Sequence, residues 1–201
     1  MNRDLRIRRT GWRTMLSLVV FSLLGYSILP LPVYANQRVQ AGDVAPDLVG
    51  RDSAGKKVKL SDYRDKIVII SFWASWCPSC RQEMAALADI QQRATRDKLV
   101  ILAVNWKENS GKYHAIVKAL KNVDLTLLSD ESGYFASQYG VTAIPHMIII
   151  GRDGRIAAVH VGYGEGEIPS LVDEINRLWT QSARPATALE TTAGSPTANP
   201  P

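Results

Sequence analysis

Cys77 and Cys80 are the only cysteines in the 201-residue chain, and two residues separate them. A bridge that closes so short a loop adds little stability. A structural zinc site needs about four ligands, whereas the three histidines of this chain are scattered with no paired ligand spacing. A Cys-x-x-Cys pair beside a strand and a helix is typical of thiol–disulfide exchange. We therefore predict a redox-active pair that needs no metal and no organic cofactor.

The flanking residues place this pair where a strand leads into a helix. Residues 66–73 form a nearly continuous apolar run, typical of a strand buried on both faces, and residues 81–96 have helical periodicity. A helix N-terminus favours a thiolate by lowering the thiol pKa. Cys77, the outer cysteine, is predicted to attack a disulfide, and Cys80, one step into the helix, to resolve the mixed disulfide. We expect Trp76 to pack beside the site and restrict water.

The remaining periodicity predicts an α/β domain with a central mixed β-sheet flanked by helices. An Asp-Gly pair at residues 153–154 marks a hairpin between two of the predicted strands. The predicted strands cover residues 99–106, 125–128, 147–150 and 156–161, and the predicted helical stretches lie near residues 113–120, 130–139 and 168–179. No glycine pattern of a phosphate-binding loop follows a strand.

The two ends of the chain differ from the middle. Residues 1–35 contain five arginines, then an uncharged stretch, then a small-residue cleavage site, as in a signal peptide. The uncharged stretch is close to the about 20 residues that a membrane span needs, so a cleaved signal peptide and a retained signal anchor both remain open. Either one places residues 36–180, the predicted domain, outside the cytoplasm, in the periplasm or on the outer face of the membrane. Residues 181–201 are rich in Ala, Thr and Pro and are expected to be disordered.

The charge is concentrated at the N-terminus. The chain has a formal net charge of +5, of which residues 1–35 supply the larger part. The domain itself is nearly neutral, which gives no support for nucleic-acid binding.

Three segments resemble one known family. Residues 72–81 (Phe-Trp-Ala-Ser-Trp-Cys-Pro-Ser-Cys-Arg) resemble the active-site segment of thioredoxin-fold proteins, and residues 42–63 and 139–145 agree with two further blocks. Together these segments resemble the TlpA/ResA-like family of exported thiol–disulfide oxidoreductases, which is related to the redoxins. The resemblance covers residues 41–179. It implies a thioredoxin-like fold with an N-terminal β-hairpin extension and an inserted strand and helix.

The resemblance also implies roles for individual residues around the cysteines. A cis bond before Pro145 would set Ile144 and Pro145 against the pair, where the backbone of Ile144 pairs with a substrate strand; the alternative is an ordinary turn proline. Pro78, which lies within the motif, is expected to support the active site. Glu83 is expected to accept the proton of Cys80, or else to be a solvated residue of the first helical turn.

Two further positions differ from thioredoxin itself. Thioredoxin has a buried aspartate where this chain has Ser71. His146 follows Pro145, where the fold more often has threonine, and it either approaches the thiols or fills the core.

The resemblance implies a reductase of disulfides in extracytoplasmic proteins, such as apocytochrome c during cytochrome c maturation. It also implies a membrane electron donor of the CcdA/DsbD type and, as we expect, a monomer. Two alternatives are open. A thiol-dependent peroxidase would need a Pro-x-x-x-Thr-x-x-Cys context, which Cys77 lacks. A copper-binding chaperone could use the thiols as soft ligands, but such chaperones have a wider cysteine spacing and a distal histidine.

Overall fold

The computed structural model of the protein describes residues 38–181. The prediction of a signal peptide or anchor over residues 1–35 lies outside the described residues, as does the predicted disordered tail over residues 181–201 apart from Gln181. Within residues 38–181, none of the helices combines the length and the apolar character that crossing a membrane requires.

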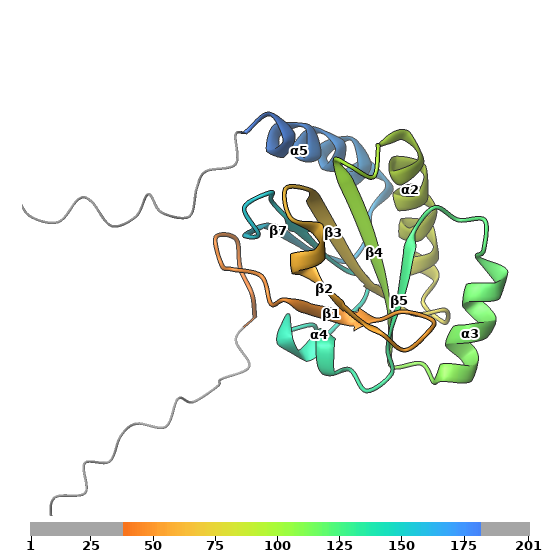
Figure 1. Ribbon diagram of the computed structural model, residues 1–201. Helices are drawn as coiled ribbons and strands as arrows, with labels where there is room; N and C mark the ends of the chain where they lie inside the picture. The colour runs from red at the N-terminus through yellow and green to blue at the C-terminus, as the bar shows by residue number, and fades with distance from the viewer. Residues whose placement is uncertain (1–37, 182–201) are drawn as a thin grey trace, which may run out of the picture. The chain divides into compact units, whose positions relative to one another are not determined.

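One seven-stranded mixed sheet organises the described residues, in the strand order β2-β1-β5-β4-β3-β6-β7 (Figure 1). The strands β3, β4 and β5 are parallel, whereas β6 is antiparallel to β3 and the other pairings are antiparallel as well. The strands are β1 (Leu48–Arg51), β2 (Lys57–Lys59), β3 (Ile67–Trp73), β4 (Leu99–Trp106), β5 (Thr126–Asp130), β6 (His146–Ile150) and β7 (Ile156–Val161). The pair β1–β2 is the predicted N-terminal hairpin.

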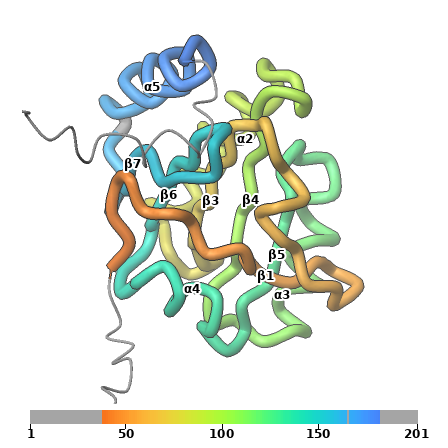
Figure 2. The backbone as a smooth tube through the Cα atoms, turned by 60° about the vertical axis from the view of Figure 1, so that its left-hand side comes forward, coloured from red at the N-terminus to blue at the C-terminus, as the bar shows by residue number. Residues whose placement is uncertain are grey.

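Helices cover both faces of this sheet (Figure 2). The α-helices are α2 (Pro78–Arg93), α3 (Ser110–Ala119), α4 (Tyr134–Gln138) and α5 (Ile168–Thr180), and two 3-10 helices lie at Leu60–Tyr63 and Glu165–Glu167. Residues of α2, α3 and α5 share one apolar cluster, and residues of α4 and the N-terminal hairpin share the other. The described domain is therefore an α/β domain with the sheet in the middle, as predicted.

Strand β3 shows why the sequence run is continuously apolar. All seven of its residues are buried. Because successive side chains point to opposite faces, Val68, Ile70 and Phe72 join the cluster of the hairpin side, while Ile67, Ile69 and Trp73 join the cluster under α2.

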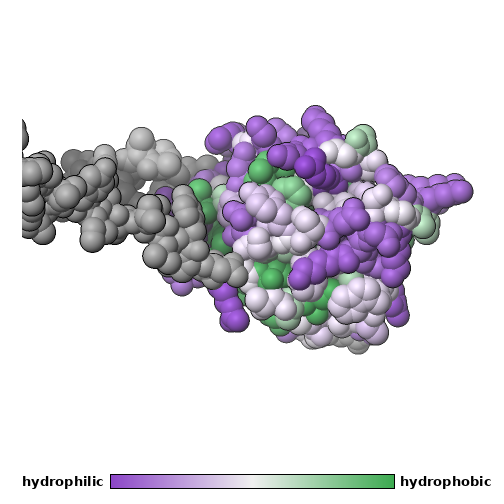
Figure 3. All heavy atoms as spheres, turned by 90° about the horizontal axis from the view of Figure 1, so that it is seen from below, coloured by the Kyte–Doolittle hydropathy of each residue, from purple (hydrophilic) through white to green (hydrophobic). Residues whose placement is uncertain are grey.

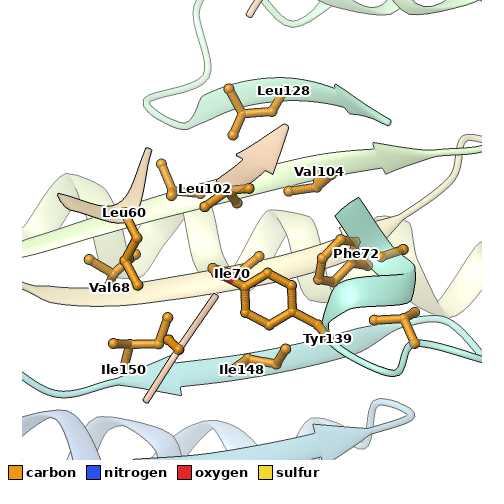
Figure 4. Close-up of a cluster of buried hydrophobic side chains, with 14 of the residues drawn as sticks. Leu60, Val68, Ile70, Phe72, Leu102, Val104, Leu128, Tyr139, Ile148 and Ile150 are labelled. Atoms are coloured by element: carbon orange, nitrogen blue, oxygen red, sulfur yellow. The ribbon is translucent and has the colours of Figure 1, made fainter. Parts of the chain in front are cut away.

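The hairpin-side cluster is closed by an aromatic pair (Figure 4). The rings of Phe72 and Tyr139 lie 5.8 Å apart between centroids. The Tyr139 side chain is fully buried, and its hydroxyl donates a hydrogen bond to the carbonyl of Pro46. This bond ties the residue after α4 to the segment that leads into β1.

Some predicted boundaries were wrong by a few residues. The helix expected over 81–96 begins at Pro78, because proline fits the first helical position and Cys77 caps the helix. It ends at Arg93. The strand expected over 125–128 is Thr126–Asp130, and the helical stretch expected over 130–139 is the short helix Tyr134–Gln138.

Candidate active site

The cysteine pair lies at the N-terminus of α2, and its two sulfurs form a disulfide. Cys77 is the N-cap residue with an extended backbone, and its Sγ accepts a hydrogen bond from the backbone N–H of Cys80 at 3.2 Å. Cys77 is 5% exposed and Cys80 is fully buried. The N–H groups and dipole of the helix therefore face the outer sulfur and favour its thiolate form after reduction.

The loop before β6 carries the residues that were predicted to lie beside this pair. The Ile144–Pro145 peptide bond is cis, which confirms the prediction. The half-buried Ile144 packs against the apolar cluster that contains both cysteines. The carbonyl of Pro145 accepts a hydrogen bond from the backbone of Gly162, so the start of β6 and the end of β7 are joined here.

Glu83 lies one helical turn after Cys80 and is 1% exposed. Its Oε1 accepts a hydrogen bond of 2.6 Å from the Ser71 hydroxyl, whereas its Oε2 has no hydrogen-bond partner among the described residues. Burial raises the pKa of Glu83 to about 7, against the opposing effect of the Ser71 hydrogen bond. The alternative of a solvated glutamate is therefore wrong, and the carboxyl group is suited to exchange protons near neutral pH.

A cavity of about 260 Å³ reaches Glu83 from the side of α5. Its lining includes His160 and Glu167, and the charge of Glu167 also raises the Glu83 pKa. His160 in turn contacts Glu174, with 3.4 Å between Nε2 and Oε2.

Trp76 and His146 differ in solvent exposure. Trp76 is 59% exposed, so the expectation that it packs over the pair and restricts water is wrong. His146 is buried, and burial lowers its pKa. Neither of its ring nitrogens has a hydrogen-bond partner among the described residues. His146 is thus part of the core at the start of β6, where it pairs in register with Phe72.

Sequence reasoning missed Glu108, which holds the residues just before Cys77. Its carboxylate accepts hydrogen bonds from the backbone and the hydroxyl of Ser75 and from the Asn105 amide. The signal was present in the topology, because parallel neighbouring strands such as β3 and β4 end at the same edge of a sheet. Residues that follow β4 therefore lie near residues that follow β3.

The site occupies the lower side of the domain as drawn in Figure 1, where α2 begins. Seen from this side, the surface carries small apolar patches separated by hydrophilic residues (Figure 3). In the described part of the chain, no group of three or more His, Cys, Asp or Glu residues is arranged to hold a metal ion.

Comparisons with known proteins agree with this geometry. Residues 41–159 match the model of the AhpC/TSA family. The thiol-disulfide oxidoreductase ResA of Bacillus subtilis is 29% identical over 77% of this chain and 86% of its own length. The thioredoxin-like protein YneN of the same organism is 34% identical over 72% of this chain and 87% of its own length. A solved structure of a putative thiol:disulfide interchange protein DsbE from Chlorobium tepidum matches with a TM-score of 0.63 and 31% identity, covering 70% of this chain and 99% of that one.

Proposed function

Because the chain belongs to the AhpC/TSA family and is a thiol–disulfide oxidoreductase of the ResA and DsbE type, we propose that it reduces protein disulfides outside the cytoplasm. The observation that carries this proposal is the geometry of the pair: a cysteine sulfur caps a helix, and a buried carboxyl group lies one turn further along. The export half of the proposal is supported by the arginines, apolar stretch and cleavage site of residues 1–35.

The chemistry is a pair of sulfur displacements. In the reduced protein, the thiolate of Cys77 attacks one sulfur of the substrate disulfide, that S–S bond breaks, and the other substrate sulfur leaves as a thiolate. Cys80 then loses its proton and attacks Cys77 Sγ, which forms the Cys77–Cys80 disulfide and frees the second substrate sulfur. Two electrons pass to the substrate. Its two sulfurs take up the proton that Cys80 releases and one proton from water, which balances the proton that Cys77 lost when its thiolate formed.

Glu83 is the group that we assign to the proton of Cys80. Its carboxyl group is buried on the same helix, and its pKa of about 7 lets it take and release protons at neutral pH. We assign Pro78, Ile144 and Pro145 to the support of the pair and of the bound substrate backbone. Trp76 offers an exposed aromatic surface next to Cys77.

We further propose that the substrate is a cysteine pair in a protein such as apocytochrome c, and that a membrane protein of the CcdA/DsbD type restores the dithiol. The likeness to proteins named ResA and DsbE supports this choice. The test mixes the reduced protein with a synthetic peptide that contains a disulfide-bonded Cys-x-x-Cys-His sequence. Release of the peptide thiols with formation of the Cys77–Cys80 disulfide is expected, and no exchange would refute the proposal.

The direction of electron flow is tested by the reduction potential of the pair in glutathione buffers. Tryptophan fluorescence follows the reaction, since Trp73 and Trp76 lie close to the cysteines in the sequence. A dedicated reductant is expected near or below about −270 mV, the value of thioredoxin, whereas a value near about −120 mV would indicate disulfide insertion instead.

A further inference from the structure

The Glu108 carboxylate makes more polar contacts than the other carboxylates near the cysteine pair. Its Oε2 accepts hydrogen bonds from the backbone N–H of Ser75 and from Asn105 Nδ2, both at 2.7 Å. Its Oε1 accepts one from the Ser75 hydroxyl at 2.7 Å and lies 3.0 Å from Lys112 Nζ. Glu108 is 4% exposed, so four donors surround a buried carboxylate.

These contacts join three segments at the edge of the sheet. Asn105 belongs to β4, Lys112 to the first turn of α3, and Ser75 to the turn between β3 and α2. Lys107, the first residue after β4, adopts a positive φ of 55°, and Glu108 is the next residue. Burial by itself raises the pKa of Glu108, but the hydrogen bonds from Ser75, Asn105 and Lys112 lower it to about 2. The carboxylate is therefore ionised at neutral pH.

Ser75 is held from its other side as well. Its carbonyl accepts a hydrogen bond of 2.9 Å from Arg81 Nη1 on the first turns of α2. The backbone N–H of Cys77 donates to the carbonyl of Ala74 at 3.2 Å, so residues 74–77 form a closed turn. All three polar groups of Ser75 are thus engaged, and the next two residues are the exposed Trp76 and the sulfur-bearing Cys77.

We propose that Glu108 is a positioning residue of the redox site, which acts through Ser75 to hold residues 74–77 in the orientation that a protein disulfide requires. This inference rests on the proposed function. Sulfur displacement needs the attacking and leaving sulfurs in line, and a protein disulfide reaches that geometry only by docking on the residues around Cys77. A small free disulfide can turn to meet the sulfur and does not depend on the docking surface.

Two variants disrupt the contact between Glu108 and Ser75 in different ways. In Glu108→Gln, one carboxylate oxygen becomes an NH₂ donor, which cannot accept from the donors that face it. In Ser75→Ala, only the hydroxyl contact is lost, and Ser75→Thr restores a hydroxyl as the rescue variant. The matched control is Asp89→Asn, which makes the same change from acid to amide at an exposed ion pair with Arg93 far along α2.

The experiment measures second-order rate constants of the reduced full chain by stopped-flow fluorescence with two probes. One probe is the disulfide-bonded Cys-x-x-Cys-His peptide, and the other is the uncharged small molecule hydroxyethyl disulfide. We expect Glu108→Gln to slow the peptide reaction about tenfold and the small-disulfide reaction by less than about twofold, because misplacement penalises oriented reactions most. Ser75→Ala should show the same selectivity more weakly, and Ser75→Thr and Asp89→Asn should react like the wild type.

The outcomes separate the two proposals. Equal slowing of both probes would mean that Glu108 changes the thiolate itself, and unchanged rates would mean that it is only structural; either result overturns the inference while the proposed function stands. A wild-type protein that reduces hydroxyethyl disulfide but not the peptide would overturn the proposed function, and the inference would fall with it. If Glu108→Gln does not fold, the comparison of Ser75→Ala with Ser75→Thr decides the matter.

Discussion

Replacing Glu83 with glutamine is expected to remove a pH-dependent loss of stability from the oxidised protein. The substitution keeps an acceptor for the Ser71 hydroxyl, which now donates to Glu83 Oε1 at 2.6 Å. The glutamine side chain does not titrate, so the variant lacks the pH-dependent charge of Glu83. The side chain is 1% exposed, so the free energy of its ionisation is set by the protein interior.

The magnitude follows from the raised pKa. Burial moves the Glu83 pKa from 4.5 to about 7. Between these values the folded protein keeps a proton that the unfolded chain has released, so the free energy of unfolding falls as the pH rises. The slope is about 1.4 kcal/mol per pH unit, and the whole loss is about 3 kcal/mol, complete above pH 7. Below pH 4.5 the contribution of Glu83 is fully present.

The assay is denaturant unfolding of the oxidised wild type and of Glu83→Gln at several pH values from 4 to 8. From pH 4 to pH 8, the free energy of unfolding of the wild type should fall by about 3 kcal/mol relative to that of Glu83→Gln. A difference that stays constant with pH would refute the reasoning. Ser71→Ala serves as an internal check: it removes the hydrogen bond that lowers the Glu83 pKa, so the loss should extend to higher pH.

Four other substitutions test the site and the packing. Cys80→Ala should trap a mixed disulfide between Cys77 and the peptide, visible as a mass adduct, and Cys77→Ala should trap none. Gln91→Leu should lower the free energy of unfolding by about 2 kcal/mol in denaturant titrations, since the buried amide bonds two backbone groups of β4. Tyr139→Phe should cost about 1 to 3 kcal/mol by the same measurement, because the buried carbonyl of Pro46 loses its donor.

The redox pair and the strand before it could be predicted from the sequence because their signals are local. The run of residues 67–73 is apolar since both faces of β3 are covered, and Cys77 follows it directly. The cis bond at Pro145 was predictable only through the resemblance, because the cis form is the minority state even before proline.

The environment of single side chains could not be predicted, since it depends on contacts between distant segments. Glu83 and an exposed glutamate look alike in the sequence, and only the packing of α2 against β3 buries this one beside Ser71. Trp76 was expected to pack beside the cysteine pair and restrict water, yet its side chain is exposed. Glu108 carries no motif, and its role arises because β3 and β4 end side by side.

Ser71 on the strand and Glu83 on the helix are hydrogen-bonded to each other. An acidic side chain at either position would therefore occupy the same place near the cysteines. Thioredoxin has a buried acid on the strand, at the position of Ser71, whereas the buried acid of this chain, Glu83, lies on the helix. Two carboxyl groups at hydrogen-bonding distance in a buried site could not both ionise without mutual repulsion. A protein of this architecture can therefore exchange one source of acid for the other, but the exchange requires paired changes at both positions, and a single acidic substitution at Ser71 would leave two acids competing for one proton.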